Sequence, residues 1–117
     1  MSTAGLGLDN VTVIVDRNGL QITGRTEDTV PLEPLADRWR AFGWAVREVD
    51  GHSRPELLEA LTSREEGRPT VVIARTVKGN GLPSVQGRVE SHYARLGERQ
   101  LARAMAVLRA RARRRNP

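Results

Sequence analysis

Three short predicted strands, two of them almost wholly apolar, constrain the fold of this chain more than any other feature. They occupy residues 11–15 (VTVIV), 44–49 (WAVREV) and 70–74 (TVVIA). The first run is also rich in β-branched residues, which is typical of a strand that is buried on both faces of a parallel sheet. Helical patterns separate them. The alternation predicts an α/β fold, a partial three-layer parallel sheet in the order strand, helix, strand, helix, strand, loop, helix.

The first helix is predicted to carry an aromatic cluster. Leu35, Trp39 and Phe42 recur at helical spacing, and Gly43 is placed to end the helix. Trp44 follows at once, so three of the four aromatic residues fall within six positions. This clustering predicts one packed hydrophobic corner. The preceding residues, 24–34, are predicted to be irregular.

The second helix begins with a capping box, Ser53-Arg54-Pro55-Glu56. In this motif the serine hydroxyl accepts from the N3 amide, and the glutamate reaches back toward the start of the helix. Three leucines then form the predicted apolar face: Leu57, Leu58 and Leu61. A last helix is predicted from about Tyr93, after a glycine-rich loop over residues 76–91.

Composition excludes several classes of protein. The 117 residues suit one small domain, and the lack of cysteine excludes disulfides, thiolate zinc sites and cysteine nucleophiles. No apolar run is long enough for a membrane helix, and residues 1–5 do not resemble a signal peptide. We therefore predict a cytoplasmic protein without a membrane partner.

The excess positive charge lies at one end of the sequence. The net charge is +5, and residues 103–115 hold six arginines and no acidic residue. We predict a domain portion over residues 1–95 and a basic C-terminal helix or tail over residues 96–117. Because the charge is confined to a tail without a known nucleic-acid motif, nucleic-acid binding is the less favoured interpretation.

Ligand chemistry is expected where the predicted strands end, since parallel strands bring their carboxyl ends to one edge of the sheet. Residues 16–20, 50–52 and 77–81 occupy that position. Within the first segment, the Asn18 amide oxygen and the Leu20 main-chain carbonyl suit a hard cation such as magnesium. The alternative is an ordinary Asn18-Gly19 turn, and spacing alone favours it.

Two other features are weaker candidates. Lys78-Gly79-Asn80-Gly81 would let backbone and a lysine approach a phosphate, although the P-loop order is absent and a flexible loop explains it as well. His52 and His92, the two histidines, would each donate to an anionic ligand or serve only as structural or solvated residues.

Four sequence blocks, in order, resemble the transketolase family. They are residues 8–24 (LDNVTVIVDRNGLQITG), 41–44 (AFGW), 49–52 (VDGH) and 68–79 (RPTVVIARTVKG). The resemblance covers about residues 5–95, and it is strongest to the split bacterial type, in which the two halves of a transketolase are separate chains.

This resemblance implies a chemistry and a set of site residues. The family binds thiamine diphosphate through magnesium and moves a two-carbon ketol unit from a ketose phosphate to an aldose phosphate. Asn18 matches the family's asparagine ligand of magnesium, and Leu20 matches the position whose carbonyl also binds the metal, so both are implied cofactor-binding residues. His92 falls where the family has a histidine near the diphosphate and the substrate, which implies a cofactor-binding and catalytic role.

The resemblance also implies partners. The family's Gly-Asp-Gly, whose aspartate is a charged magnesium ligand, and its pyrimidine-binding domain are absent from the sequence. We therefore expect a homo- or hetero-oligomer in which a Gly-Asp-Gly segment and a pyrimidine-binding subunit complete the site, and no activity from the chain alone. Two alternatives stay open: a non-catalytic interaction module derived from a transketolase, and a basic nucleic-acid-binding protein.

Overall fold

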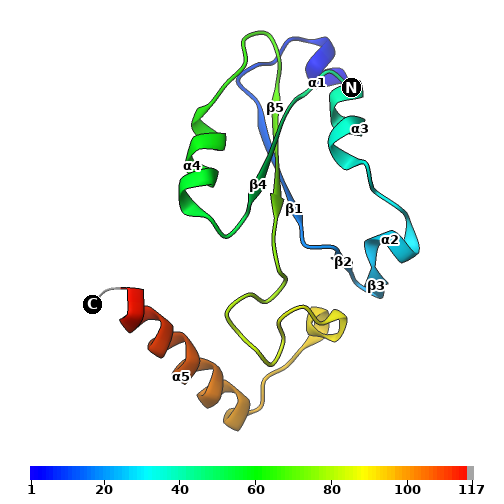
Figure 1. Ribbon diagram of the computed structural model, residues 1–117. Helices are drawn as coiled ribbons and strands as arrows, with labels where there is room; N and C mark the ends of the chain where they lie inside the picture. Colours follow the sequence, from blue (N-terminus) through cyan, green and yellow to red (C-terminus); the bar gives the residue numbers. More distant parts are fainter. Residues whose placement is uncertain (116–117) are drawn as a thin grey trace.

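Three parallel strands form the centre of the molecule in a computed structural model that describes residues 1–115 (Figure 1). They are β1 (Thr12–Arg17), β4 (Ala45–Asp50) and β5 (Thr70–Arg75), in the spatial order β1-β5-β4. Val71 of β5 lies opposite Val13 on one side and Val46 on the other. The predicted parallel α/β arrangement is confirmed, and each strand lies within two residues of its predicted bounds.

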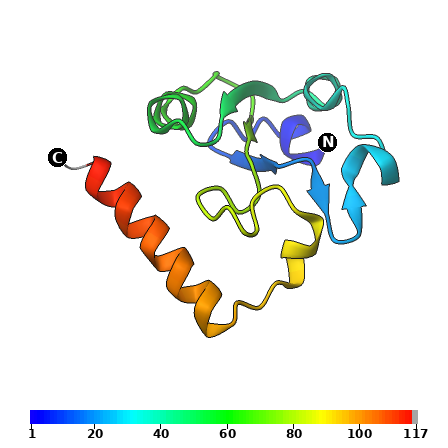
Figure 2. The same ribbon diagram turned by 60° about the horizontal axis from the view of Figure 1, so that its bottom comes forward.

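Two helices cover opposite faces of this sheet. α3 (Leu35–Ala41) lies in the connection from β1 to β4, and α4 (Arg54–Thr62) connects β4 to β5. Figures 1 and 2 show the two helices on either side of the strands, with the short α1 (Ser2–Gly5) near α3. Since the two crossovers run in opposite directions along the sheet, right-handed connections place the helices on opposite faces.

The core lies between the sheet and α3. Trp44, Val71 and Ile73 are buried there, and half-buried side chains of α3 and β1 pack against them. Trp39 meets Trp44 edge to face, with ring centroids 5.0 Å apart. The predicted aromatic corner therefore exists, but Phe42 is 49% exposed and stands outside it.

On the opposite face, α4 packs against β4 and β5 through a narrower stripe than predicted. Ala60 is buried and Leu57 half-buried, whereas Leu58 is 66% exposed and Leu61 is also exposed. The prediction of one face with three leucines was wrong. Residues 57 and 60 share a face because they are three positions apart, and each exposed leucine is turned by about 100° from its neighbour.

The capping box at the start of α4 is present in part. The Ser53 hydroxyl accepts from the Glu56 amide at 3.5 Å, as predicted. The Glu56 carboxylate reaches past Ser53 and accepts from the Asp50 amide at 2.9 Å. The glutamate thus joins the first turn of α4 to the last residue of β4.

Only the middle strand is buried throughout, apart from its last residue. β5 lies between two strands and under both helices, which explains its burial on both faces. β1 differs: Val13 and Val15 pack on the core, but Ile14, which points to the opposite face, is 57% exposed. Burial of β1 on both faces was therefore a wrong prediction for the chain by itself.

Two segments differ from the expected outline. Residues 20–29, predicted to be irregular from 24 onward, form β2 (Leu20–Gln21), β3 (Gly24–Arg25) and α2 (Thr26–Thr29). Beyond β5, a loop leads to the 3-10 helix η1 (Val89–Tyr93) and then to α5 (Glu98–Arg115), which starts later than predicted. α5 extends away from the sheet (Figure 2). Within the described residues, none of the helices has the length and apolar character needed to cross a membrane.

Candidate functional site

The three strand-end segments meet at one edge of the sheet, as predicted. Because β5 is the middle strand, its extension contacts both neighbours. The Thr76 hydroxyl donates a short hydrogen bond to Asp16 Oδ1 beyond β1. On the other side, the Val77 amide donates to His52 Nε2 at 2.8 Å. The carboxyl ends of the strands therefore form one continuous polar rim.

Asn18 and Leu20 form a compact turn on this rim. Asn18 Oδ1 accepts from the Leu20 amide at 2.9 Å, and Gly19 between them has φ of 75°, which favours glycine. The turn interpretation is therefore correct for the geometry. It does not exclude a ligand role, because an amide oxygen has two lone pairs and the internal bond uses one.

A carboxylate lies beside this turn, and sequence reasoning did not assign it a role. Asp16 Oδ1 accepts from Asn18 Nδ2 at 3.4 Å as well as from the Thr76 hydroxyl. Asp16 therefore orients the Asn18 amide group from the side opposite its oxygen. The sequence signal that could have identified Asp16 is its spacing from Asn18, since residues two apart at the end of a strand point to the same side.

The two histidines have different surroundings. His52 Nε2 accepts the hydrogen bond from the Val77 amide, and this bond ties the end of β4 to the loop after β5. His92 is exposed on η1 and stands edge to face against Tyr93, with centroids 4.9 Å apart. η1 contacts β2, which begins with Leu20, so His92 lies on the same side of the molecule as the Asn18 turn.

The glycine-rich loop is folded on itself. The amides of Asn80 and Leu82 donate to carbonyls within the loop, and the Gly81 amide donates to Gln86 Oε1 at 3.2 Å. The Gly87 amide closes the loop onto the Lys78 carbonyl at 2.9 Å. These amides serve the loop itself, which favours the structural interpretation over a phosphate cradle.

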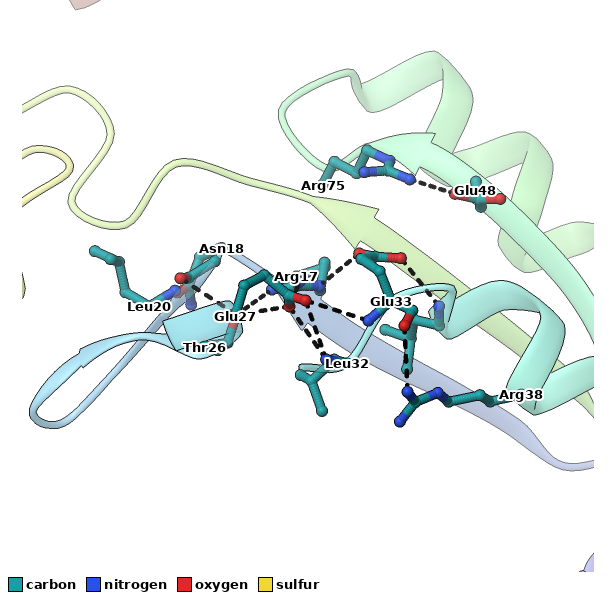
Figure 3. Close-up of polar contacts among 12 residues, drawn as sticks. Arg17, Asn18, Leu20, Thr26, Glu27, Leu32, Glu33, Arg38, Glu48 and Arg75 are labelled. Atoms are coloured by element: carbon teal, nitrogen blue, oxygen red, sulfur yellow. Dashed lines mark hydrogen bonds and ion pairs between the residues drawn. The ribbon is translucent and has the colours of Figure 1, made fainter. Parts of the chain in front are cut away.

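Next to the turn lies a charged cluster around Arg17, shown in Figure 3. The Arg17 guanidinium contacts Glu27 at 2.5 Å and Glu33 at 3.2 Å, and donates to the Thr26 hydroxyl at 2.8 Å. Arg75 lies nearby and pairs with Glu48 at 2.6 Å. Arg17, Glu27 and Glu33, together with Asn18 and Gly19, line a polar cavity of about 210 Å³. Sequence reasoning missed this cluster, because the ion pairs of Arg17 span 10 and 16 residues and leave no periodic signal.

Hydrogen bonds and ion pairs shift the pKa values of three groups in this cluster. Desolvation acts to raise the pKa of Glu27, but the amides of Leu32 and Glu33, the Thr26 hydroxyl and Arg17 together hold it below its ordinary value. The Leu35 amide, followed by Arg17, lowers the pKa of Glu33 against a smaller desolvation effect. The hydrogen bond and charge of Glu48 raise the pKa of Arg75. The cluster is thus built around ionised side chains.

Comparison with known proteins identifies the family. The chain matches the family described as transketolase, thiamine diphosphate binding domain, over residues 1–111. The chain belongs to this family. The resemblance that residues 8–24 and the later blocks carry is thereby confirmed, and thiamine diphosphate is the cofactor that the family's domain binds.

Two relatives are subunits of transketolases. The 6-deoxy-6-sulfo-D-fructose transketolase subunit SqwG of a Clostridium species is 39% identical over 110 residues, which make up 92% of this chain and 40% of SqwG. An apulose-4-phosphate transketolase subunit from Phocaeicola vulgatus is 39% identical over 88 residues, 74% of this chain and 31% of the relative.

The crystal structure of transketolase from Campylobacter jejuni matches with a TM-score of 0.78 at 33% identity, over 88% of this chain and 16% of that one. The transketolase-like chain thus spans 40% or less of the length of each of these proteins.

Proposed function

We propose that this transketolase-family chain holds the diphosphate end of thiamine diphosphate, through magnesium, in an enzyme that transfers a two-carbon ketol unit between sugar phosphates. The observation that supports it is the Asn18–Leu20 turn, which lies on the ligand-binding rim of a family domain that binds this cofactor. When bound, thiamine diphosphate supplies the carbon nucleophile that accepts the ketol unit.

The residues of the turn fit part of a magnesium shell. Magnesium takes six oxygens and commonly combines one or two protein ligands with phosphate oxygens. The Asn18 side-chain oxygen, fixed in direction by the Leu20 amide, and the Leu20 carbonyl are the two proposed protein ligands. Within the part of the chain that the structure describes, no three His, Cys, Asp or Glu side chains gather as a metal site. We therefore assign the charged protein ligand to a Gly-Asp-Gly segment outside residues 1–117.

His92 is the proposed donor toward the diphosphate and the sugar substrate. It is exposed, and its element η1 contacts the strand that begins at Leu20. A histidine in this position holds an anionic oxygen by donating a hydrogen bond, and it transfers a proton near neutral pH. Its substitution is expected to impair the reaction more than cofactor binding.

The proposed partner is a pyrimidine-binding transketolase subunit. Exposed apolar side chains support an assembly, since Ile14, Phe42 and Leu58 lie on different elements and all are at least 49% exposed. SqwG and the relative from Phocaeicola vulgatus are themselves named as transketolase subunits. The chain alone is proposed to be inactive.

The test begins with the chain isolated, under mild conditions, from its own cell together with the polypeptides bound to it. This assembly, given magnesium and thiamine diphosphate, is expected to transfer a ketol unit from a ketose phosphate to an aldose phosphate. The isolated chain is expected to give no transfer. Asn18→Ala should abolish the assembly's activity, whereas Asn10→Ala, which changes an exposed residue ahead of β1, should leave it intact.

Two results would contradict the proposal: ketol transfer by the isolated chain, or full activity of an assembly that carries Asn18→Ala. An assembly that forms but binds no thiamine diphosphate would instead support the non-catalytic interaction module.

A further inference from the structure

Arg17 is a largely buried charged side chain with several partners near the candidate site. Only 9% of the side chain is exposed, and its guanidinium meets three acceptors on the segment that folds over the end of β1. Burial of a guanidinium is unfavourable unless its donors are paired, so an arginine in this position requires all of these partners at once. The arrangement therefore suits arginine, whose planar fork spreads five donors over three nitrogens, whereas a lysine holds its three donors on one nitrogen.

One of these acceptors leads directly to the metal-binding turn. The Thr26 hydroxyl accepts from Arg17 Nη1 at 2.8 Å, and the Thr26 amide donates to the Gly19 carbonyl at 3.0 Å. Gly19 lies between the two proposed magnesium ligands, Asn18 and Leu20. Thr26 therefore links the guanidinium to the middle of the turn (Figure 3).

The other two acceptors connect the turn to the body of the domain. Glu27 accepts from the Leu32 amide at 3.2 Å, and Glu33 accepts from the Leu35 amide at 3.0 Å at the start of α3. α3 in turn packs on the core through Leu35. The position of the turn is thus tied to a packed helix and not only to its own hairpin.

We propose that Arg17 is a positioning residue that fixes the Asn18–Leu20 turn in the geometry that binds the cofactor's magnesium. It acts through Thr26 on Gly19 and through Glu27 and Glu33 on α3, without touching metal or substrate itself. The inference rests on the proposed function of the turn. Outer residues that orient metal ligands commonly change metal affinity by about 10- to 100-fold when substituted, and we expect a loss of this size.

The test compares three arginine variants. Arg17→Met removes the donors and keeps most of the apolar stem, and Arg17→Lys keeps the charge but not the fork. Arg40→Met is the matched control, because Arg40 also pairs with a carboxylate, Asp37 at 2.7 Å, on the exposed side of α3. Thr26→Val removes the linking hydroxyl at nearly constant volume, and it serves as the second probe if Arg17→Met does not fold.

The first readout is amide hydrogen exchange of the full chain without ligand. In Arg17→Met and Thr26→Val, exchange at Leu20 and Thr26 is expected to accelerate about tenfold or more, while the amides of β5 keep their protection. The second readout is the magnesium concentration that half-saturates thiamine diphosphate binding by the isolated assembly. It should rise by about 10- to 100-fold in Arg17→Met and less in Arg17→Lys, and Arg40→Met should match wild type in both readouts.

Unchanged exchange at Leu20 and Thr26 would overturn the inference whatever the cofactor does. Faster exchange with unchanged magnesium dependence would overturn it too, because Arg17 would then be a structural residue only. If the wild-type assembly binds no thiamine diphosphate, the proposed function fails, and the exchange measurement alone decides whether Arg17 holds the turn.

Discussion

Glu27 joins the turn region to the segment that leads into α3. Its oxygens accept from the Leu32 amide at 3.2 Å and pair with Arg17 at 2.5 Å. All of these contacts favour the ionised form, and together they hold the pKa of Glu27 below its ordinary value of 4.5 against desolvation. The charge of this one residue therefore contributes to the stability of the folded chain.

The sign of this contribution gives a pH prediction. Because the pKa is lower in the folded than in the unfolded chain, Glu27 stabilises the fold above its unfolded pKa, and this stability is lost as the pH falls through the folded value. Glu27→Gln should therefore lower the free energy of unfolding at pH 7, and the difference from wild type should shrink as the pH falls from 7 toward about 3. Urea unfolding at both pH values measures it.

The control for this experiment is Glu66→Gln, since Glu66 is exposed and has no ion pair among residues 1–114. Its variant should follow wild type at both pH values. A Glu27→Gln variant whose deficit stays constant from pH 7 to pH 3 would contradict the assignment, because the loss would then not depend on ionisation.

At the residue scale, the sequence could single out the proposed ligands, Asn18 and Leu20, but not the residues that position them. Asn18 and Leu20 stand out because a strand end followed by Asn-Gly is a local pattern, and the family resemblance assigns them a role. Arg17 could not be found in the same way. Its partners Glu27 and Glu33 lie 10 and 16 residues away, and only the folded hairpin brings them together.

At the scale of single elements, the contribution of the Ser53 cap to the stability of α4 can be tested by substitution. The Ser53 hydroxyl accepts from the Glu56 amide, and without it that amide at the start of the helix loses its acceptor. Ser53→Ala is expected to destabilise the chain by about 0.5–1 kcal/mol, toward the low end for a cap because the bond is long. Ser53→Asp, which keeps an acceptor, should retain most of the wild-type stability in urea unfolding. Equal losses in both variants would show that the cap does not stabilise α4.

The elements that the sequence predicted well are those with signals inside a single segment. β1 and β5 follow from apolar runs, and the start of α4 follows from its cap. The orientation of α4 was wrong because three leucines offer two possible faces, and only the sheet decides between them. The hairpin of β2 and β3 was missed, since two strands of two residues each are too short for an alternating pattern.

At the scale of the whole molecule, apolar side chains are distributed unevenly over the sheet. The described chain measures 52 × 40 × 18 Å, so the layers are thin and the outer strands have limited cover. Ile73 of β5 is 1% exposed on the α3 face, whereas Ile14 of β1 is 57% exposed on the opposite face. We propose that the partner covers the face of β1 that carries Ile14.

Substitution of each isoleucine by alanine distinguishes a contribution to the stability of the chain from a contribution to partner binding. Ile73→Ala is expected to destabilise the isolated chain by about 2–5 kcal/mol, because it leaves a cavity in the core. Ile14→Ala should change that stability by no more than about 0.5 kcal/mol, as is usual for exposed positions. In the assembly, however, Ile14→Ala should weaken binding of the pyrimidine-binding partner, measured by titration of the purified chain with that partner. If Ile14→Ala left the partner's affinity unchanged, this face of β1 would lie outside the interface, and its exposed isoleucine would have to be explained by the chain alone.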